Sequence, residues 1–292
     1  MSGAHTADSG GEVRGPALML TAIALFAVLD TIAKWLSAGY GSAQVIGLRS
    51  AVGLALSLPF AVRAEPIAGD RLPLHLLRGL MILASAFFFF QAFALLPLLD
   101  AYIVFFLAPF FTMGLAVAVL GERVGLRAWA WAGLAFLGVL VPILPALSGG
   151  GPLLGYLSAL VGTAATAGVM ITTRKLGARE GLAVAMAVPA LLGVVLFGPF
   201  AVAFWVGPSP RDLVLLVLNG VVWTGANLAL TAAVRAAEPS RLAPLDFTAM
   251  LWAVLFDAGV FGLAPGVLDL VGAAVVVVAT LGHQADQRRE RG

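Results

Sequence analysis

The chain contains no cysteine and few charged residues. Charged residues make up 11% of its 292 residues, hydrophobic residues make up 61%, and the mean hydropathy is +1.02. The lack of cysteine excludes disulfides, thiol catalysis and cysteine-type metal sites. A soluble domain carries about 25% charged residues, so this composition cannot cover a water-exposed surface. It indicates an integral membrane protein.

Other missing patterns narrow the function. The sequence has no Gly-Lys dipeptide, and hence no phosphate-binding P-loop, and it has no Gly-x-Ser-x-Gly hydrolase motif. The three histidines, His5, His75 and His283, lie near predicted helix ends or in tails. We therefore predict no catalytic residue, no cofactor, no metal site and no nucleic-acid partner.

Long apolar runs predict ten membrane-spanning helices. Backbone groups in lipid restrict a spanning chain to helices or a closed barrel, and runs such as 272–281 lack the alternation of barrel strands. Each run is near the ~20 residues that a bilayer requires. The predicted helices are 16–38, 43–62, 75–96, 99–120, 128–146, 153–173, 182–206, 213–234, 241–263 and 267–282. Residues 1–15 are predicted to be a disordered tail, and residues 283–292 a basic tail.

The placement of positive charge predicts the orientation. With ten spans, 14 of the 17 basic residues fall on the side that holds both termini. They are Arg14, Arg63, Arg71, Arg78, Arg123, Arg127, Arg174, Lys175, Arg179, Arg235, Arg241, Arg288, Arg289 and Arg291. Because cytoplasmic loops are enriched in Lys and Arg, both termini are predicted to be cytoplasmic.

Short segments recur in a consistent order and predict an internal repeat. Pro-Phe-Ala-Val occurs at 59–62 and 199–202, and Lys34 matches Arg174 at the same spacing of 140 residues. Leu-Ala-Pro occurs at 107–109 and 242–244, a spacing of 135. The alternative is that such matches arise by chance in a biased composition. Residues 16–146 and 153–282 are thus predicted to be two five-helix repeats of inverted topology, as in many secondary transporters.

The ends of the two halves also resemble a known family. Leu107-Ala-Pro, then Leu120-Gly-Glu-Arg123 and Gly133, is similar to the end of an EamA-type repeat of the drug/metabolite transporter superfamily. The segment 243–248, followed by Phe261-Gly262 and Gly272, resembles the second copy and also resembles bacterial aromatic amino-acid exporters. One departure is Leu263, because the family usually has Glu directly after Phe-Gly.

The resemblance implies alternating access and metabolite export across the bacterial inner membrane. It implies a central cavity lined mainly by the first, third, fourth, sixth, eighth and ninth helices. The fifth and tenth helices are then peripheral, where they could form a homodimer.

Among the charged residues inside the predicted helices, where each costs about 2.5–3.5 kcal/mol at mid-span, five are candidates for a functional role. They are Asp30, Lys34, Arg49, Asp246 and Asp257. Asp30 and Lys34 are four residues apart and could pair, either to meet a zwitterionic head group or as a structural pair with Lys34 reaching the interface. Arg49 could bind a carboxylate, neutralise Asp30 or cap carbonyls. Asp246 is predicted to be a solvated gate or a binding residue, and Asp257 a water-facing vestibule residue or a protonatable site.

Polar and aromatic side chains predict the walls of the cavity. Asn219, Trp223, Asn227 and Thr231 recur every fourth residue and share one helix face, which could be glue between helices or the cavity wall. The other candidates for the wall are Phe87, Gln91, Tyr102, Phe106, Thr163 and Thr166. The cavity has no cluster of Arg and Lys suited to phosphates, which argues against nucleotide sugars.

We therefore predict a secondary transporter that exports aromatic or other neutral amino acids, with Pro109 and Pro244 as equivalent hinges. The nearest alternative is the same fold exporting other metabolites or drugs. A lipid-modifying membrane enzyme would need a catalytic cluster, which the sequence does not contain, and a scaffold protein would not need a polar stripe at mid-depth.

Overall fold

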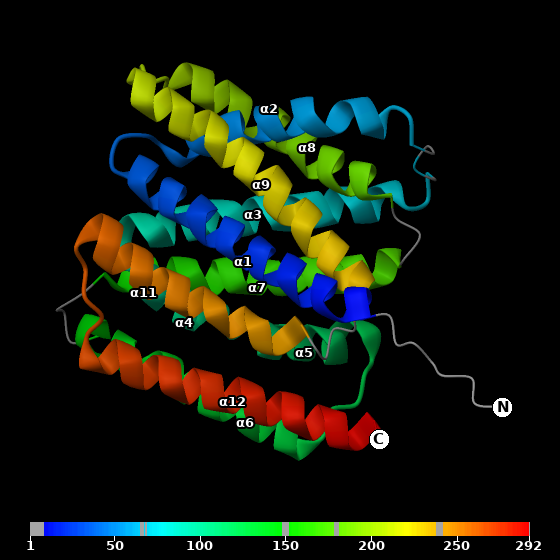
Figure 1. Cartoon of the computed structure of the whole chain (residues 1–292), viewed down its shortest axis with the longest axis vertical. Coiled ribbons are helices and arrows are strands. Elements are labelled where there is room, and N and C mark those ends of the chain that lie inside the picture. The colour runs from blue at the N-terminus through cyan, green and yellow to red at the C-terminus, as the bar shows by residue number, and fades with distance from the viewer. Residues whose placement is uncertain are drawn as a thin grey trace.

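The computed structural model describes residues 9–64, 67, 69–147, 152–177, 181–237 and 242–291, and this part of the chain folds into helices without a strand. Ten of the helices are long and apolar enough to cross a membrane. The predicted all-α, ten-span architecture is thus confirmed (Figure 1).

The first half contains five spans, the fourth of which is broken. Its elements are α1 (Ser9–Ser37), α2 (Ser42–Ala61), α3 (Leu72–Leu95), α4 (Leu98–Phe105), α5 (Ala108–Leu115), the π-helical η1 (Ala116–Leu120) and α6 (Leu126–Leu147). The second half has the same order, and its ninth span opens with a 3₁₀ turn. Its elements are α7 (Leu153–Leu176), α8 (Leu182–Ala203), α9 (Pro210–Ala236), η2 (Ala243–Phe247), α11 (Thr248–Phe261) and α12 (Val267–Arg291).

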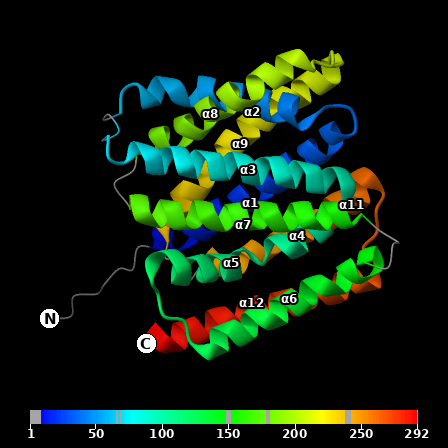
Figure 2. The same cartoon turned by 180° about the vertical axis from the view of Figure 1, so that it is seen from behind.

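The helix pairs have the symmetry of an inverted repeat. The first span packs on the eighth (α1 on α9), and the third packs on the sixth (α3 on α7). Exchanging the two halves converts one pair into the other. The second and seventh spans (α2, α8), the fourth and ninth (α4, α11) and the fifth and tenth (α6, α12) pack on each other. The α6–α12 pair forms one edge of the bundle (Figures 1 and 2).

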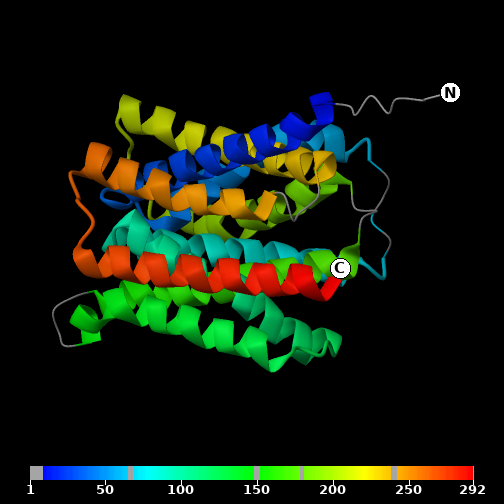
Figure 3. The same ribbon diagram turned by 60° about the horizontal axis from the view of Figure 1, so that its bottom comes forward.

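The start of α1 and the end of α12 lie at the same end of the bundle (Figure 3). We call this end the termini face and the opposite end the far face. The turn between α3 and α4 lies at the far face, and the segment between η1 and α6 lies at the termini face (Figure 2).

Backbone geometry corrects the register of the repeat at the fourth and ninth spans. Gly121 and Gly262 end these spans at φ values of +69° and +67°, a conformation that glycine adopts without strain. They are 141 residues apart, as are Phe106 and Phe247, whose rings stack at 5.1 Å and 10°. We infer that the pseudo-two-fold axis passes close to this stack.

The predicted equivalence of the two prolines is therefore wrong. Pro109 lies in the middle of its span, at the start of α5, whereas Pro244 lies at the beginning of the span 244–261. The repeated Leu-Ala-Pro is a local match and does not mark the same depth in both halves, since its spacing of 135 differs from that of the glycines.

The predicted tails differ from the observed ends. Helix α1 begins at Ser9, so residues 9–15 are helical, while residues 1–8 lie outside the described part of the chain. Helix α12 continues to Arg291, beyond the predicted end at 282. The added turns pack on the bundle, because His283 lies against Phe110 and Trp131 donates its indole N–H to Asp286 at 2.8 Å.

Small residues let α2 and α8 approach closely. A Cβ atom added at Gly193 would lie 2.1 Å from Ser50 Oγ, whereas at Gly198 of the same helix it would lie 3.9 Å from its nearest atom. Contact between these two helices therefore requires glycine at 193 and not at 198.

We expect Gly193→Val to lower the free energy of unfolding by about 1–3 kcal/mol, because overpacking forces α2 and α8 apart. Gly198→Val changes helix propensity by the same amount, but the added side chain does not press on α2. It should therefore lower the free energy of unfolding much less. Thermal unfolding of the purified variants in detergent measures both. Equal stabilities for the two variants would contradict this account of the contact.

Candidate functional site

Four side chains from four different helices meet inside the bundle and form what we call the central site. They are Asp30 of α1, Arg49 of α2, Tyr102 of α4 and Trp223 of α9. The Tyr102 hydroxyl donates a hydrogen bond of 2.7 Å to Asp30 Oδ2. Arg49 interacts electrostatically with Asp30, and its guanidinium lies 5.9 Å from the ring centroid of Trp223. The site thus combines opposite charges with two aromatic rings.

Two glycines bring α2 and α9 close enough to build this site. A Cβ at Gly53 would lie 2.8 Å from the ring of Trp223, and one at Gly220 would lie 3.0 Å from the backbone oxygen of Arg49. Larger residues at either position would displace the indole ring or the backbone that carries Arg49. Trp223 lies midway along α9, so the site is at mid-depth of that span.

A small cavity adjoins the central site. It is lined by Arg49, Ser50, Ile82, Leu83, Pro189, Ala190 and Trp223. Its volume is about 10 Å³, the least space that holds one water molecule. No metabolite fits in such a volume, so a substrate can occupy this place only when helices move apart.

The predicted pairing of Asp30 with Lys34 is wrong. Lys34 donates to the backbone oxygens of Leu96 and Phe93, and its ammonium lies 5.2 Å from the ring centroid of Phe261. Among the described residues, Asp30 forms its hydrogen bond with Tyr102 instead. The two charges share a face of α1, but each has a partner on another helix.

The prediction that Asp257 faces water is also wrong. Asp257 is 3% exposed, and its two carboxylate oxygens each accept a backbone N–H at 3.0 Å, from Leu98 and Leu99. It therefore caps the N-terminus of α4 from a different helix.

The predicted polar wall is only partly present. Gln91 is exposed, which contradicts its predicted inward position, because α3 buries the faces of Phe90 and Phe93 instead. The hydroxyl of Thr163 donates to the Ala159 carbonyl of its own helix at 2.8 Å. Asn227 likewise donates to the carbonyl of Trp223 at 2.8 Å. Thr163 also donates to the Val104 carbonyl of α4 at 3.4 Å, and neither Thr163 nor Asn227 lines the cavity described above.

Other predicted residues join helices to each other. Thr166 shares a 2.8 Å hydrogen bond with Ser85, which joins α7 to α3, and Asn219 donates to the backbone oxygen of Leu29 on α1 at 3.2 Å. The ring of Phe87 stacks on Phe197 of α8, with centroids 6.2 Å apart. Within the polar stripe, Asn219 therefore joins two helices, whereas Trp223 lines the cavity.

The remaining predicted residues lie near the breaks in the fourth and ninth spans. Pro109 and Pro244 are exposed, and Asp246 is partly buried within η2. Phe106, at the end of α4, stacks on Phe247, at the end of η2. The irregular backbone of both spans thus meets near the pseudo-two-fold axis.

One buried acidic group was missed by the sequence reasoning. Asp100 is 5% exposed, and its Oδ2 accepts a 2.6 Å hydrogen bond from the Tyr156 hydroxyl. Asp269 of α12 interacts electrostatically with it. Asp100 is the second residue of the predicted span 99–120, and the sequence alone does not distinguish this position from a helix-end charge in water.

We expect the Asp30 and Arg49 side chains to be energetically coupled. Arg49→Gln leaves the Asp30 carboxylate without its cation. The substitution should therefore lower the stability of the protein more when Asp30 is present than when Asp30 is already replaced by Asn. The expected coupling is about 0.5–3 kcal/mol, the range for residues in one network of polar groups. A double-mutant cycle on thermal stability measures it, and strictly additive effects would show that the two charges are independent.

The comparisons with known proteins agree with this architecture. Residues 13–144 match the model of the EamA-like transporter family. An S-adenosylmethionine uptake transporter of Rickettsia prowazekii is 23% identical over 92% of each chain. A riboflavin transporter of Rhizobium johnstonii is 29% identical over 96% of this chain and 94% of its own, and a pseudopaline exporter of Pseudomonas aeruginosa is 29% identical over 91% and 94%.

A crystal structure supports the fold over almost the whole length. It covers 95% of this chain and 99% of its own, with a TM-score of 0.63 at 22% identity. Together with the family match, the relatives and the ten spans, this leads to one conclusion. Residues 13–144 match the EamA-like transporter family, and over more than 90% of its length the chain is similar to transporters of small molecules, which identifies a multi-pass membrane transporter and not an enzyme.

Proposed function

We propose that this transporter exports small zwitterionic metabolites with a planar ring, above all aromatic and other neutral amino acids. The observation that carries the proposal is the central site, where Asp30 and Arg49 lie together with Tyr102 and Trp223. An α-amino acid carries one positive and one negative group on neighbouring atoms, so it complements this pair of charges.

Each group of the substrate has a partner in the proposed complex. The ammonium group pairs with Asp30, and the carboxylate accepts two parallel hydrogen bonds from the guanidinium of Arg49. The guanidinium of Arg49 turns from the ring of Trp223 toward the carboxylate of the substrate. An aromatic side chain of the substrate then stacks on Trp223. The bound state keeps a net charge of zero, which matters because an unpaired charge inside a membrane is costly.

The relatives favour one alternative within the same class. S-adenosylmethionine has an amino-acid head and a planar purine, and riboflavin has a planar heteroaromatic ring. Both molecules share features with the proposed ligand, so larger heteroaromatic metabolites are the second candidate. The relatives also differ in direction, since one is named an uptake transporter and another an exporter. The relatives therefore do not give the direction of transport, and export is our own proposal.

We propose that transport proceeds by alternating access, with helix bundles rocking around the central site. The break between Phe105 and Ala108, directly before Pro109, supplies a hinge in the fourth span, and the 3₁₀ turn with Pro244 supplies one in the ninth. The hinges act at different depths. Coupling is either passive or driven by a proton carried on Asp30.

We place the protein in the bacterial inner membrane with cytoplasmic termini, on the strength of the positive charges at the termini face. The α6–α12 pair at the edge of the bundle would provide the contact of a homodimer. Under this orientation the far face opens to the periplasm.

Liposomes containing the purified protein test the substrate directly. They are loaded with labelled tryptophan, phenylalanine, threonine, S-adenosylmethionine, riboflavin or a nucleotide sugar, and release is followed with and without a pH gradient. We expect faster release of tryptophan and phenylalanine than of threonine, and no release of the nucleotide sugar. Acceleration by the gradient that Asp30→Asn abolishes would identify Asp30 as the proton carrier. Release of riboflavin or S-adenosylmethionine alone would overturn the amino-acid proposal.

Arg49→Lys tests the role of the guanidinium. Lysine keeps the charge but loses the paired hydrogen bonds, so the KM for the transported amino acid should rise about tenfold or more, in keeping with about 1.5–3 kcal/mol for a charged hydrogen bond. The matched control is Arg211→Lys, because Arg211 lies 4.7 Å from the ring of Trp35 in a similar arginine–tryptophan pair outside the central site. A similar KM change in both variants would argue against a specific role for Arg49.

A further inference from the structure

The turn between α3 and α4 at the far face is held by side chains from two other helices. Lys34 of α1 donates to the backbone oxygens of Leu96 and Phe93, at the end of α3. Asp257 of α11 accepts the N–H groups of Leu98 and Leu99, at the start of α4, both at 3.0 Å. We call Lys34 and Asp257, together with this turn, the far-face latch.

The chemistry of the far-face latch suits the two helix ends that it joins. A helix leaves its last carbonyls and first N–H groups unpaired, and these ends carry partial negative and positive charge. The cation therefore binds the end of α3, and the carboxylate binds the start of α4. Leu96 is 2% exposed, Leu98 is 1% exposed and Asp257 is 3% exposed, so water cannot easily replace these partners. Asp100, Asp269 and the Tyr156 hydroxyl are the other polar groups nearby.

The far-face latch is directly connected to the central site. Lys34 lies one helical turn after Asp30 on α1, and Leu98 lies one turn before Tyr102 on α4. Lys34 and the N–H groups bound by Asp257 therefore belong to α1 and α4, the two helices that the 2.7 Å bond between Tyr102 and Asp30 joins. Movement of α4 away from α1 breaks the bond in the site, and movement of the α3–α4 turn away from α1 or α11 breaks the latch.

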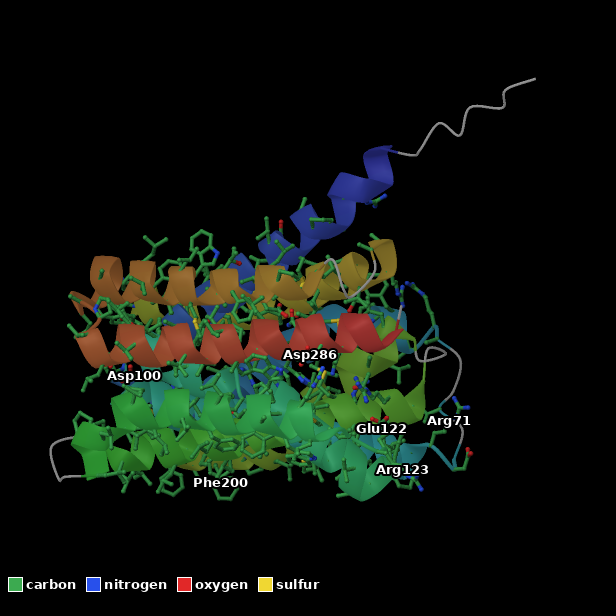
Figure 4. The ribbon with its side chains drawn as sticks, turned by 90° about the horizontal axis from the view of Figure 1, so that it is seen from below. Arg71, Asp100, Glu122, Arg123, Phe200 and Asp286 are labelled. Carbon is green, nitrogen blue, oxygen red and sulfur yellow. The ribbon has the colours of Figure 1, made fainter. Side chains whose placement is uncertain are left out.

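The exposed counterpart of Lys34 lies at the termini face, where the buried Arg78 also donates to the Ala185 carbonyl at 2.7 Å. Arg174, which matches Lys34 in the repeat, lies 3.6 Å from Glu122, at the end of the fourth span. These side chains are 56% and 50% exposed, and an exposed ion pair contributes little because water and salt screen it. Leu263 stands where the second half would have the counterpart of Glu122. Figure 4 shows Glu122 near the termini face and Asp100 toward the opposite end.

We propose that Lys34 and Asp257 are positioning residues that hold the far face closed, so that the protein at rest opens more readily toward the termini face. Neither side chain contacts the substrate in the proposed complex. Binding of a zwitterion to Asp30 draws that carboxylate away from Tyr102 and loosens α4, so the far face opens after loading from the termini face. This inference rests on the proposed alternating access but on no particular substrate.

The absence of cysteine from the chain makes a labelling test possible without background. Two single-cysteine reporters are needed. Ala190→Cys lies in the lining of the central cavity, where Ala190 is 1% exposed, and Leu99→Cys lies in the latch itself, where Leu99 is 3% exposed. A membrane-impermeant maleimide is added from one side at a time, to right-side-out and to inside-out membrane vesicles.

In the unaltered latch, Ala190→Cys should react faster from the termini face than from the far face. Asp257→Ala should raise far-face labelling of Ala190→Cys about tenfold and lower its labelling from the termini face. Lys34→Met should shift labelling in the same direction. This second variant keeps the test possible if Asp257→Ala fails to fold. Asp257→Asn should stay close to the unaltered protein, because an asparagine oxygen still caps a helix.

Ser209→Ala is the matched control. It removes another helix N-cap, the 3.1 Å bond from the Asp212 N–H to Ser209 Oγ, at the start of α9 but outside the latch. Labelling of Ala190→Cys should not change. If Asp257→Ala and Lys34→Met increase labelling only at Leu99→Cys, the two residues merely prevent fraying of α4 and the inference is overturned. Unchanged labelling at both reporters would overturn it as well. Because no substrate is present, failure of the amino-acid proposal would not alter these results.

Discussion

Inside a membrane, every charge and every backbone polar group must find its partner within the protein, and the interior of this transporter is arranged around that constraint. Three of its carboxylates illustrate this constraint. Asp30 accepts the hydroxyl of Tyr102, Asp100 accepts that of Tyr156, and Asp257 accepts two backbone N–H groups. Each bond joins two different helices. The polar groups therefore determine which helices stay together, whereas the apolar side chains, which suit lipid as well as protein, discriminate less between partners.

The two halves of the repeat contribute different kinds of side chain to the central site. The two halves share helix order, packing pairs and the left-handed glycines at 121 and 262, so the backbone is nearly two-fold. The charges are not duplicated: Asp30 and Arg49 both come from the first half, and Trp223 comes from the second. A symmetric backbone supplies two similar ways of opening, and an asymmetric set of side chains makes the two faces unequal in strength.

The spans, their number and the inverted repeat could be predicted because hydropathy and charge placement are averages over many residues. The partners of single side chains could not. Asp30 and Lys34 share a helix face, which favours a pair, yet hydroxyl and carbonyl groups on neighbouring helices compete for both. Gln91 was assigned inward on its polarity alone, and the packing of Phe90 and Phe93 turns it outward. The Leu-Ala-Pro match misled because backbone conformation, and not residue identity, marks equivalent depth.

Direction of transport is a property of the two faces more than of the binding site. Relatives with this architecture are named for uptake in one case and export in another, although a ligand bound at mid-depth is equally distant from both exits. For a passive carrier the gradient decides net flow, and the protein decides only which face opens first and how long it stays open. In this chain the bonds of Lys34 and Asp257 at the far face are more buried than the exposed pair of Arg174 and Glu122 at the termini face. A carrier built in this way spends most of its time ready to load from the side of its termini, which is the arrangement that export requires.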